Sequence, residues 1–182
     1  MTKTNKETLT AILVAAASNS ESGTGAAYMW TLKDIKAHKW EKHSYHTGEA
    51  YATDKCLVGA FSMGIDAAAQ YAAREYPDRL LRIECVTYAD SIVNSFNKQR
   101  PIWESNGYIN RLGRPVKNQR AWKALFKKAD THRAIVRKPL KVCQVLTSCL
   151  YLARNASVTA AEQKIENETA AQVRRALEKD AK

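Results

Sequence analysis

The sequence contains no apolar run that approaches the ~20 residues of a membrane-spanning helix. A polar stretch follows Met1, and no charged-then-apolar leader with a cleavage site comes after it. The cysteines form neither a CxxC pair nor a zinc-ligand pattern; they lie in apolar segments, at Cys56, Cys85, Cys143 and Cys149. We therefore expect reduced core cysteines in a cytoplasmic protein that has no membrane partner.

Acidic residues are scarce relative to basic ones. The 182 residues include 29 Lys and Arg against 18 Asp and Glu, which gives a formal net charge of +11 at pH 7 and a pI of about 9.6. Such an excess favours polyanionic partners, with nucleic acid first and an anionic membrane surface second. The alternative is a basic surface that is merely solvated.

Internal repeats and low-complexity linkers are also absent from the sequence. Apolar residues make up 45% of the chain, which is enough to form a core and argues against wholesale disorder. The length suits one domain with an appendage. We expect a domain over residues 1–156 and a charged C-terminal helix or tail over residues 157–182.

The N-terminal part of the chain has the pattern of β-strands. Residues 8–17 form an apolar run with β-branched members, and a Ser/Asn/Gly turn follows, as expected for a buried central strand. Residues 26–32 and 40–47 predict two more strands. Short turns between the three strands predict an antiparallel meander.

Apolar residues then recur at helical spacing. Leu57, Phe61 and Ile65 lie four residues apart in an alanine-rich stretch, which predicts an amphipathic helix over residues 53–75. The further predicted elements are a strand over 80–88, a short helix over 89–96, an irregular segment over 101–115, a helix over 118–129, a strand over 134–136 and helices over 142–156 and 160–182. The last helix is expected to start at a capping box of Thr159 and Glu162. This order predicts an α/β fold in which helices flank a mixed sheet.

Several short strings occur in the order and spacing of a known family. They are Asp90-Ser91 after a strand, Gly107-Tyr108, Gly113-Arg114-Pro115-Val116-Lys117-Asn118, Trp122 with Leu125, and Leu152-Ala153-Arg154-Asn155-Ala156 in a helix. Together they resemble bacterial type-1 ribonuclease H over roughly residues 8–156. The resemblance implies a ribonuclease-H-like mixed five-stranded sheet, with three antiparallel strands first, and leaves a C-terminal helical extension outside it.

The resemblance also implies four metal-binding acids, because two-metal hydrolysis needs several carboxylates that converge on the ions. The matching positions are Ala15, Val58, Asp90 and Leu150, so Asp90 is the sole retained catalytic acid. The family's Gly-His-x-Gly loop is missing between residues 137 and 143. We therefore expect a degenerate, catalytically inactive member without a metal or other cofactor, in which Val58 and Leu150 fill the former metal pocket beside Ala15.

Asp90 has a second interpretation, since an Asp at a strand-to-helix switch can simply cap the helix. Asp54, Asp66 and Glu21 are the nearest candidates for a rearranged acidic site. With such a site the chain would be an active, Mg²⁺-dependent ribonuclease H that hydrolyses RNA in RNA–DNA hybrids. His43 and His46 point to opposite faces of one strand, so we do not expect them to bind a metal together.

The stretch from residue 111 to residue 141 carries eleven Lys and Arg against the single acid Asp130. We call the helix predicted over residues 118–129 and the loop before it the basic handle, after the element of the resembled family that grips the DNA strand of a hybrid. Three of its cations share one helix face. The predicted phosphate contacts, called the handle cations below, are Arg111, Arg114, Lys117, Arg120, Lys123 and Lys127.

Trp103 and Tyr108 lie just before the handle helix and can either stack on bases or pack in the core. The leading hypothesis is a catalytically inactive domain that binds RNA–DNA hybrid or double-stranded RNA through its shape and its phosphates. The alternatives are the active nuclease and a protein-interaction scaffold, whose protein partner binds residues 159–182.

Overall fold

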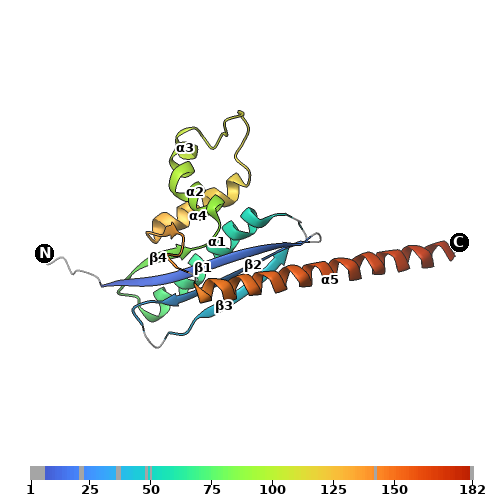
Figure 1. The fold of residues 1–182 in the computed structure, drawn as a ribbon, viewed down its shortest axis with the longest axis horizontal. Coiled ribbons are helices and arrows are strands. Elements are labelled where there is room, and N and C mark those ends of the chain that lie inside the picture. Colours follow the sequence, from blue (N-terminus) through green and yellow to red (C-terminus); the bar gives the residue numbers. More distant parts are fainter. Residues whose placement is uncertain are drawn as a thin grey trace.

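The computed structural model describes residues 7–20, 23–35, 38–47, 49, 51–141 and 143–180. Its centre is a mixed sheet in the order β3-β2-β1-β4-β5 (Figure 1). The first three strands are antiparallel, and β4 and β5 run parallel to β1. The strands are β1 (Thr8–Ser20), β2 (Gly23–Leu32), β3 (Glu41–Thr47), β4 (Leu80–Val86) and β5 (Ile135–Arg137). The predicted α/β class and the antiparallel meander are therefore confirmed.

Helices cover both faces of this sheet. They are α1 (Thr53–Glu75), α2 (Asp90–Asn94), the π-helix η1 (Ser95–Gln99), α3 (Arg100–Ser105), α4 (Gln119–Thr131) and α5 (Gln144–Asp180). The long helix α5 crosses one face, while α1 lies on the other and α4 packs against α1 (Figure 1). Among the described helices, none combines the length and the apolarity needed to cross a membrane.

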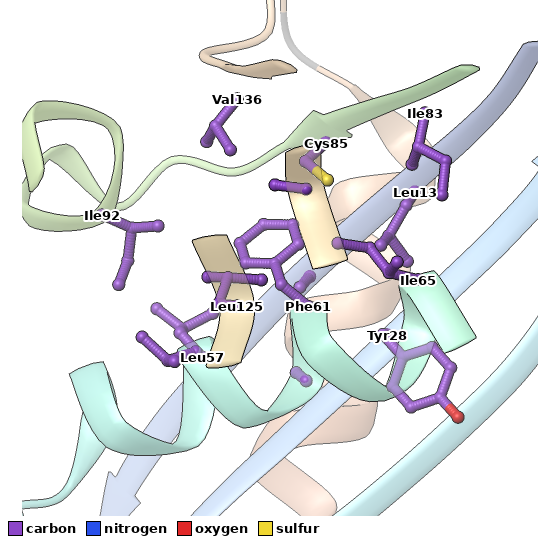
Figure 2. Close-up of a cluster of buried hydrophobic side chains, with 14 of the residues drawn as sticks. Leu13, Tyr28, Leu57, Phe61, Ile65, Ile83, Cys85, Ile92, Leu125 and Val136 are labelled. Carbon is purple, nitrogen blue, oxygen red and sulfur yellow. The ribbon is translucent and has the colours of Figure 1, made fainter. Parts of the chain in front are cut away.

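Strand β1 is buried on both sides because its successive side chains alternate between the two faces. Leu13 and Ala15 join the core under α1, whereas Val14 and Ala16 join the smaller core under α5. In Figure 2, Phe61 of α1 lies in the middle of the larger core, between the strands and α4. The two-sided burial explains why the sequence of β1 is a continuous apolar run.

Helix α5 approaches the sheet most closely at Gly25 of β2. A Cβ atom at this position would lie 2.0 Å from the backbone oxygen of Ala153 and 2.4 Å from the backbone nitrogen of Ser157. The thiol of Cys149 on the same helix donates to the backbone oxygen of Ala27, at 3.2 Å. The missing side chain of Gly25 therefore sets how deeply α5 sits on the sheet.

The structure corrects the prediction for the C-terminal helices. The sequence predicted a break near residue 157 and a capping box at Thr159, but α5 runs without interruption from Gln144 to Asp180. The Thr159 hydroxyl donates to the backbone oxygen of Asn155 inside the helix, at 3.2 Å. No Gly or Pro lies between residues 143 and 182, so the backbone has no strong reason to leave the helix.

The predicted irregular segment 101–115 is also more regular than expected, because α3 occupies its first residues. The cysteine prediction is confirmed in that all four thiols are free. Cys56, Cys85 and Cys149 are buried, and Cys143 is only partly buried.

The close approach at Gly25 predicts that adding one methyl group there lowers the stability of the fold. Gly25→Ala should lower the free energy of unfolding by roughly 3 kcal/mol, because the clash is with helix backbone that cannot move locally. Urea unfolding monitored by circular dichroism measures this free energy.

Gly59→Ala is the matched control: its Cβ would meet only the end of the Tyr45 side chain. That variant should stay within about 1 kcal/mol of the parent, since Ala also favours the helix. Equal losses in both variants would contradict this account.

Candidate nucleic-acid interface and an adjoining apolar hollow

A hollow of about 250 Å³ lies where the carboxyl-terminal parts of β1 and β4 meet the first turns of α1 and α5. Most of its lining is aliphatic, and the polar atoms come from two threonines and one tyrosine. We call it the apolar hollow. Its lining residues are Ala15, Ala16, Ala17, Thr53, Leu57, Thr87, Tyr88, Ala89, Leu146 and Leu150.

Two of the three apolar residues that the sequence analysis grouped together lie together in the structure. Ala15 and Leu150 both line the apolar hollow, whereas the predicted Val58 does not. Val58 is fully buried in the core, and Leu57 takes the position facing the hollow. One residue along a helix turns the side chain by about 100°. Both neighbours are apolar, so the sequence carried no signal that could have fixed this register.

Asp90, the sole retained acid, is the first residue of α2 but does not cap it. The N-cap residue is Ala89, and no side chain makes a capping hydrogen bond there, so the capping interpretation is wrong. Instead, the Asp90 carboxylate forms an ion pair with the ammonium group of Lys138, from the segment after β5. The side chain of Asp90 is 67% exposed. A lysine therefore neutralises this acid at the edge of the hollow.

Asp54 and Asp66 have different partners in the structure. Asp54, at the start of α1, accepts a hydrogen bond of 2.8 Å from the hydroxyl of Ser91, the neighbour of Asp90. Asp66 forms an ion pair with Lys128 on α4. Glu21 lies outside the described residues. Asp54 and Asp90 are thus linked through Ser91, while Asp66 joins α1 to α4.

The donors around the hollow do not suit a Mg²⁺ pair. Hard Mg²⁺ prefers oxygen ligands, and several carboxylates are needed to bind two ions. Over the described ranges, no group of three or more His, Cys, Asp or Glu side chains is placed to hold a metal ion. The positions where the resemblance implies three of the four acids hold apolar residues, Ala15, Val58 and Leu150.

The loop of the basic handle is a compact turn with a defined tip. Backbone pairing between Ile109 and Pro115 closes it. Inside the turn, the side-chain oxygen of Asn110 accepts hydrogen bonds from the backbone N–H groups of Leu112, at 2.9 Å, and Arg114, at 3.1 Å. Gly113 has a φ of +72°, a conformation that glycine adopts without strain. These contacts leave the side chains at the tip, including Arg111 and Arg114, exposed to solvent.

Helix α4 has one buried and one cationic face. Trp122, Leu125, Phe126 and Ala129 pack in the core. Arg120, Lys123 and Lys127 are exposed and recur at the three- and four-residue spacing that places them on one face. Lys128 is different, because its ammonium group donates to the hydroxyl of Ser62, at 2.7 Å, and pairs with Asp66.

The handle cations have no carboxylate partner in the described part of the chain, where none of the six forms an ion pair. The pKa of Glu49 is lowered mainly by the hydrogen bond and the charge of Lys55, and to a smaller extent by the charge of Lys117. All six side chains are exposed. The six handle cations therefore have no carboxylate partner among the described residues.

The two aromatic side chains pack within the handle. Tyr108 is 8% exposed, and the Lys123 ammonium lies 4.6 Å from the centroid of its ring. Trp103 is partly buried and meets Trp122 edge-on, with 5.6 Å between ring centroids. The geometry therefore favours the core interpretation of both residues over stacking on bases. Tyr108 also supports the position of Lys123 through a cation–π contact.

No protein-family model matches the sequence, and no curated protein does. Among solved structures, the chain is similar to the foamy virus protease–reverse transcriptase in complex with double-stranded DNA, at a TM-score of 0.63 and 19% identity over 87% of this chain and 99% of that one. It is also similar to the foamy virus protein in complex with an RNA/DNA hybrid, at a TM-score of 0.64 and 19% identity, over 87% of this chain and 21% of that one.

A type 1 RNase H that carries the type 2 active-site motif is similar at a TM-score of 0.66 and 14% identity, over 86% of this chain and 76% of that one. The N-terminal RNase H domain of a Mycobacterium tuberculosis protein gives a TM-score of 0.63 and 11% identity, over 86% and 99% of the two chains. These similarities show that the chain has the RNase H-like fold that the sequence predicted.

The donor set of the hollow predicts that Mg²⁺ does not stabilise the folded protein. Millimolar Mg²⁺ should leave the melting temperature at its value in potassium chloride of equal ionic strength. A metal at a hundred times its dissociation constant would instead add about 2.7 kcal/mol. Lys138→Met is the control variant: it frees the Asp90 carboxylate, yet one carboxylate still cannot hold two ions. A clear Mg²⁺-dependent rise in the parent would contradict this interpretation.

Proposed function

We propose that this chain binds RNA–DNA hybrid or double-stranded RNA through the basic handle and does not cleave it. One observation carries the proposal: six exposed handle cations, unpaired among the described residues, lie on a fold in which three of the four positions that the resemblance implies for metal-binding acids are apolar. In support, one similar structure is a viral protein in complex with an RNA/DNA hybrid. The cytoplasmic location stays a prediction from the sequence.

The spacing of the α4 cations suits a phosphate backbone. Side chains three and four residues apart on a helix lie about 5–6 Å apart at Cβ, so Arg120, Lys123 and Lys127 form a short row. Three like charges in such a row repel one another in the free protein. A bound polyanion removes this repulsion and releases counterions, which makes binding dependent on salt. Contacts of this kind read helix geometry and phosphates rather than base sequence.

The inactivity rests on the chemistry of the apolar hollow. Leu57 and Leu150 offer no ligand atoms, and Ala15 offers none at the third position. Lys138 supplies the positive charge beside Asp90 that a metal ion would otherwise supply. The apolar lining also relieves the repulsion that clustered carboxylates would cause without a metal. The proposed domain therefore requires no cofactor for folding or for binding.

The handle assignment predicts the behaviour of a charge-reversal variant. Lys123→Glu/Lys127→Glu should weaken binding to labelled hybrid roughly tenfold or more at low salt, and should do so similarly for duplex RNA and duplex DNA. The slope of log affinity against log salt should fall in magnitude by about two, one for each lost phosphate contact. Fluorescence anisotropy at several potassium chloride concentrations measures both quantities.

A matched control places the same charge change elsewhere. Lys39 and Lys42 are exposed at and before the edge strand β3, and neither forms an ion pair among the described residues. Lys39→Glu/Lys42→Glu should therefore weaken binding much less than the handle variant. If the handle variant binds all three duplexes as tightly as the parent, the handle assignment is wrong.

The active nuclease is the second candidate. It is favoured by the hydrogen bond between Asp54 and Ser91, because Ser91 is the neighbour of Asp90 in the chain. We expect labelled hybrid to stay intact after prolonged incubation with the protein and either Mg²⁺ or Mn²⁺. Cleavage by the parent that disappears in Asp54→Asn/Asp90→Asn would overturn the proposal and assign the nuclease. Cleavage that persists in that variant would point to a contaminating enzyme, and a repurified sample would then have to leave the hybrid intact.

The scaffold is the third candidate, because α5 continues well past the end of the sheet (Figure 1). A protein partner along residues 159–182 is compatible with nucleic-acid binding at the handle, since the two lie on different elements. Deleting these residues should leave hybrid affinity unchanged if the handle alone binds it.

A further inference from the structure

Strand β4 has a strand partner along only part of its outer side. Strand β5 pairs with Glu84, Cys85 and Val86 and reaches no further toward the start of β4. Residues Leu80–Ile83 therefore have β1 on one side and no strand among the described residues on the other. We call Leu80–Ile83 the free edge of β4. Unpaired backbone N–H and C=O groups at the edge of a sheet can pair with a strand of another chain.

The backbone groups of β4 alternate between its two sides. The Leu80 N–H points toward β1, because it donates to the backbone oxygen of the residue before β1, at 3.1 Å. The Thr87 N–H points the other way and donates to the last residue of β5, at 3.2 Å. Since this direction alternates along a strand, the backbone groups of Leu81 and Ile83 face outward, as those of Thr87 do. They are the groups that a further strand would meet.

A cavity of about 670 Å³ lies beside the free edge, between it and the C-terminal ends of α1 and α4. We call it the edge cavity. Ala69, Ala72 and Ala73 form its wall on α1, and their small side chains leave room for larger ones. His132 also lines it, and burial lowers the pKa of this imidazole below its ordinary value, so the ring is neutral at pH 7. The edge cavity therefore suits apolar side chains.

The other face of the sheet carries a charge at the same edge. Leu81 and Ile83 point into the core under α1, so the side chain of Arg82 between them points to the opposite face. Arg82 is exposed and forms no ion pair with any described residue. A strand added at this edge would therefore meet alanines on one face and an unpaired guanidinium on the other.

The charges near the free edge favour an acidic partner over a second copy of this chain. The side chains lining the edge cavity that are charged at pH 7 are Arg79, Arg82 and Arg133, and no carboxylate is among them. Arg79 pairs with Glu7, at 2.8 Å. A second copy, itself with a formal net charge of +11, would bring like charges together here.

We propose that the free edge of β4 binds an extended peptide of a partner protein, in which apolar and acidic side chains alternate. Side chains that pair across neighbouring strands share a face. Those opposite Leu81 and Ile83 enter the edge cavity, and the acidic one opposite Arg82 pairs with its guanidinium. Backbone hydrogen bonds supply affinity, and the alternating side chains supply specificity. Peptide binding at this edge does not depend on what the basic handle binds.

Titration of the full chain with a fluorescein-labelled peptide, Glu-Val-Glu-Val-Glu-Val-Glu, tests this site by fluorescence anisotropy. The dissociation constant should be about 100 μM or lower. A peptide of the same composition with its valines grouped together should bind at least about tenfold more weakly, because the alternation is lost. Amide hydrogen exchange followed by NMR locates the peptide: exchange at Leu81 and Ile83 should slow when it binds, since both N–H groups gain hydrogen bonds.

Two variants separate the two faces of the added strand. Ala73→Trp should weaken binding roughly tenfold or more, because the indole occupies the edge cavity. Arg82→Glu should weaken it similarly, and it should improve binding of the peptide Lys-Val-Lys-Val-Lys-Val-Lys, because the ion pair then forms with reversed charges. Thermal unfolding checks that each variant folds. The proposal fails if both variants bind the acidic peptide as the parent does.

Controls at two other surfaces test the location. Strand β3 is the other edge of the sheet, and Lys42→Glu changes the charge there. This variant and Lys123→Glu/Lys127→Glu in the handle should both leave peptide affinity unchanged at physiological salt, which screens distant charges. A loss in either would assign the peptide to that surface and overturn the proposal. So would unprotected Leu81 and Ile83 amides in the complex, or a dimer of the parent that Ala73→Trp dissociates.

Discussion

The burial of β1 on both faces is the constraint on which the rest of this structure depends. Its alternate side chains, Leu13 with Ala15 and Val14 with Ala16, enter the two cores beneath α1 and α5. A strand packed on both sides cannot shift its register without exposing apolar surface. It therefore fixes both layers of helices, and with them the end of the sheet where the apolar hollow lies.

The apolar hollow and the handle cations lie in different parts of the structure. The apolar hollow lies where a metal-dependent enzyme of this fold would place several carboxylates, and aliphatic side chains there avoid the cost of holding like charges together. The cations lie instead on exposed surfaces of the handle, where water solvates them. The proposed binding through this surface needs no buried charge and no metal.

Where sequence reasoning failed, the missing information was long-range. The helix pattern over residues 53–75 was sound, but it could not decide whether Leu57 or Val58 faces the hollow. The alternative interpretation of Asp90 as a capping residue failed because its partner, Lys138, follows a different strand. Thr159 and Glu162 match a capping box, yet a local signal worth about 1 kcal/mol did not end a helix that contains no breaker.

The sequence by itself determined the order of the strands, the fold class and the cationic face of α4, because each follows from local periodicity or from charge spacing along one element. Only the tertiary structure decided which side chains meet across elements: Lys138 with Asp90, Ser91 with Asp54, and Lys128 with Asp66. Such contacts join residues far apart in the chain. They depend on how the helices pack against β1, which no local pattern records.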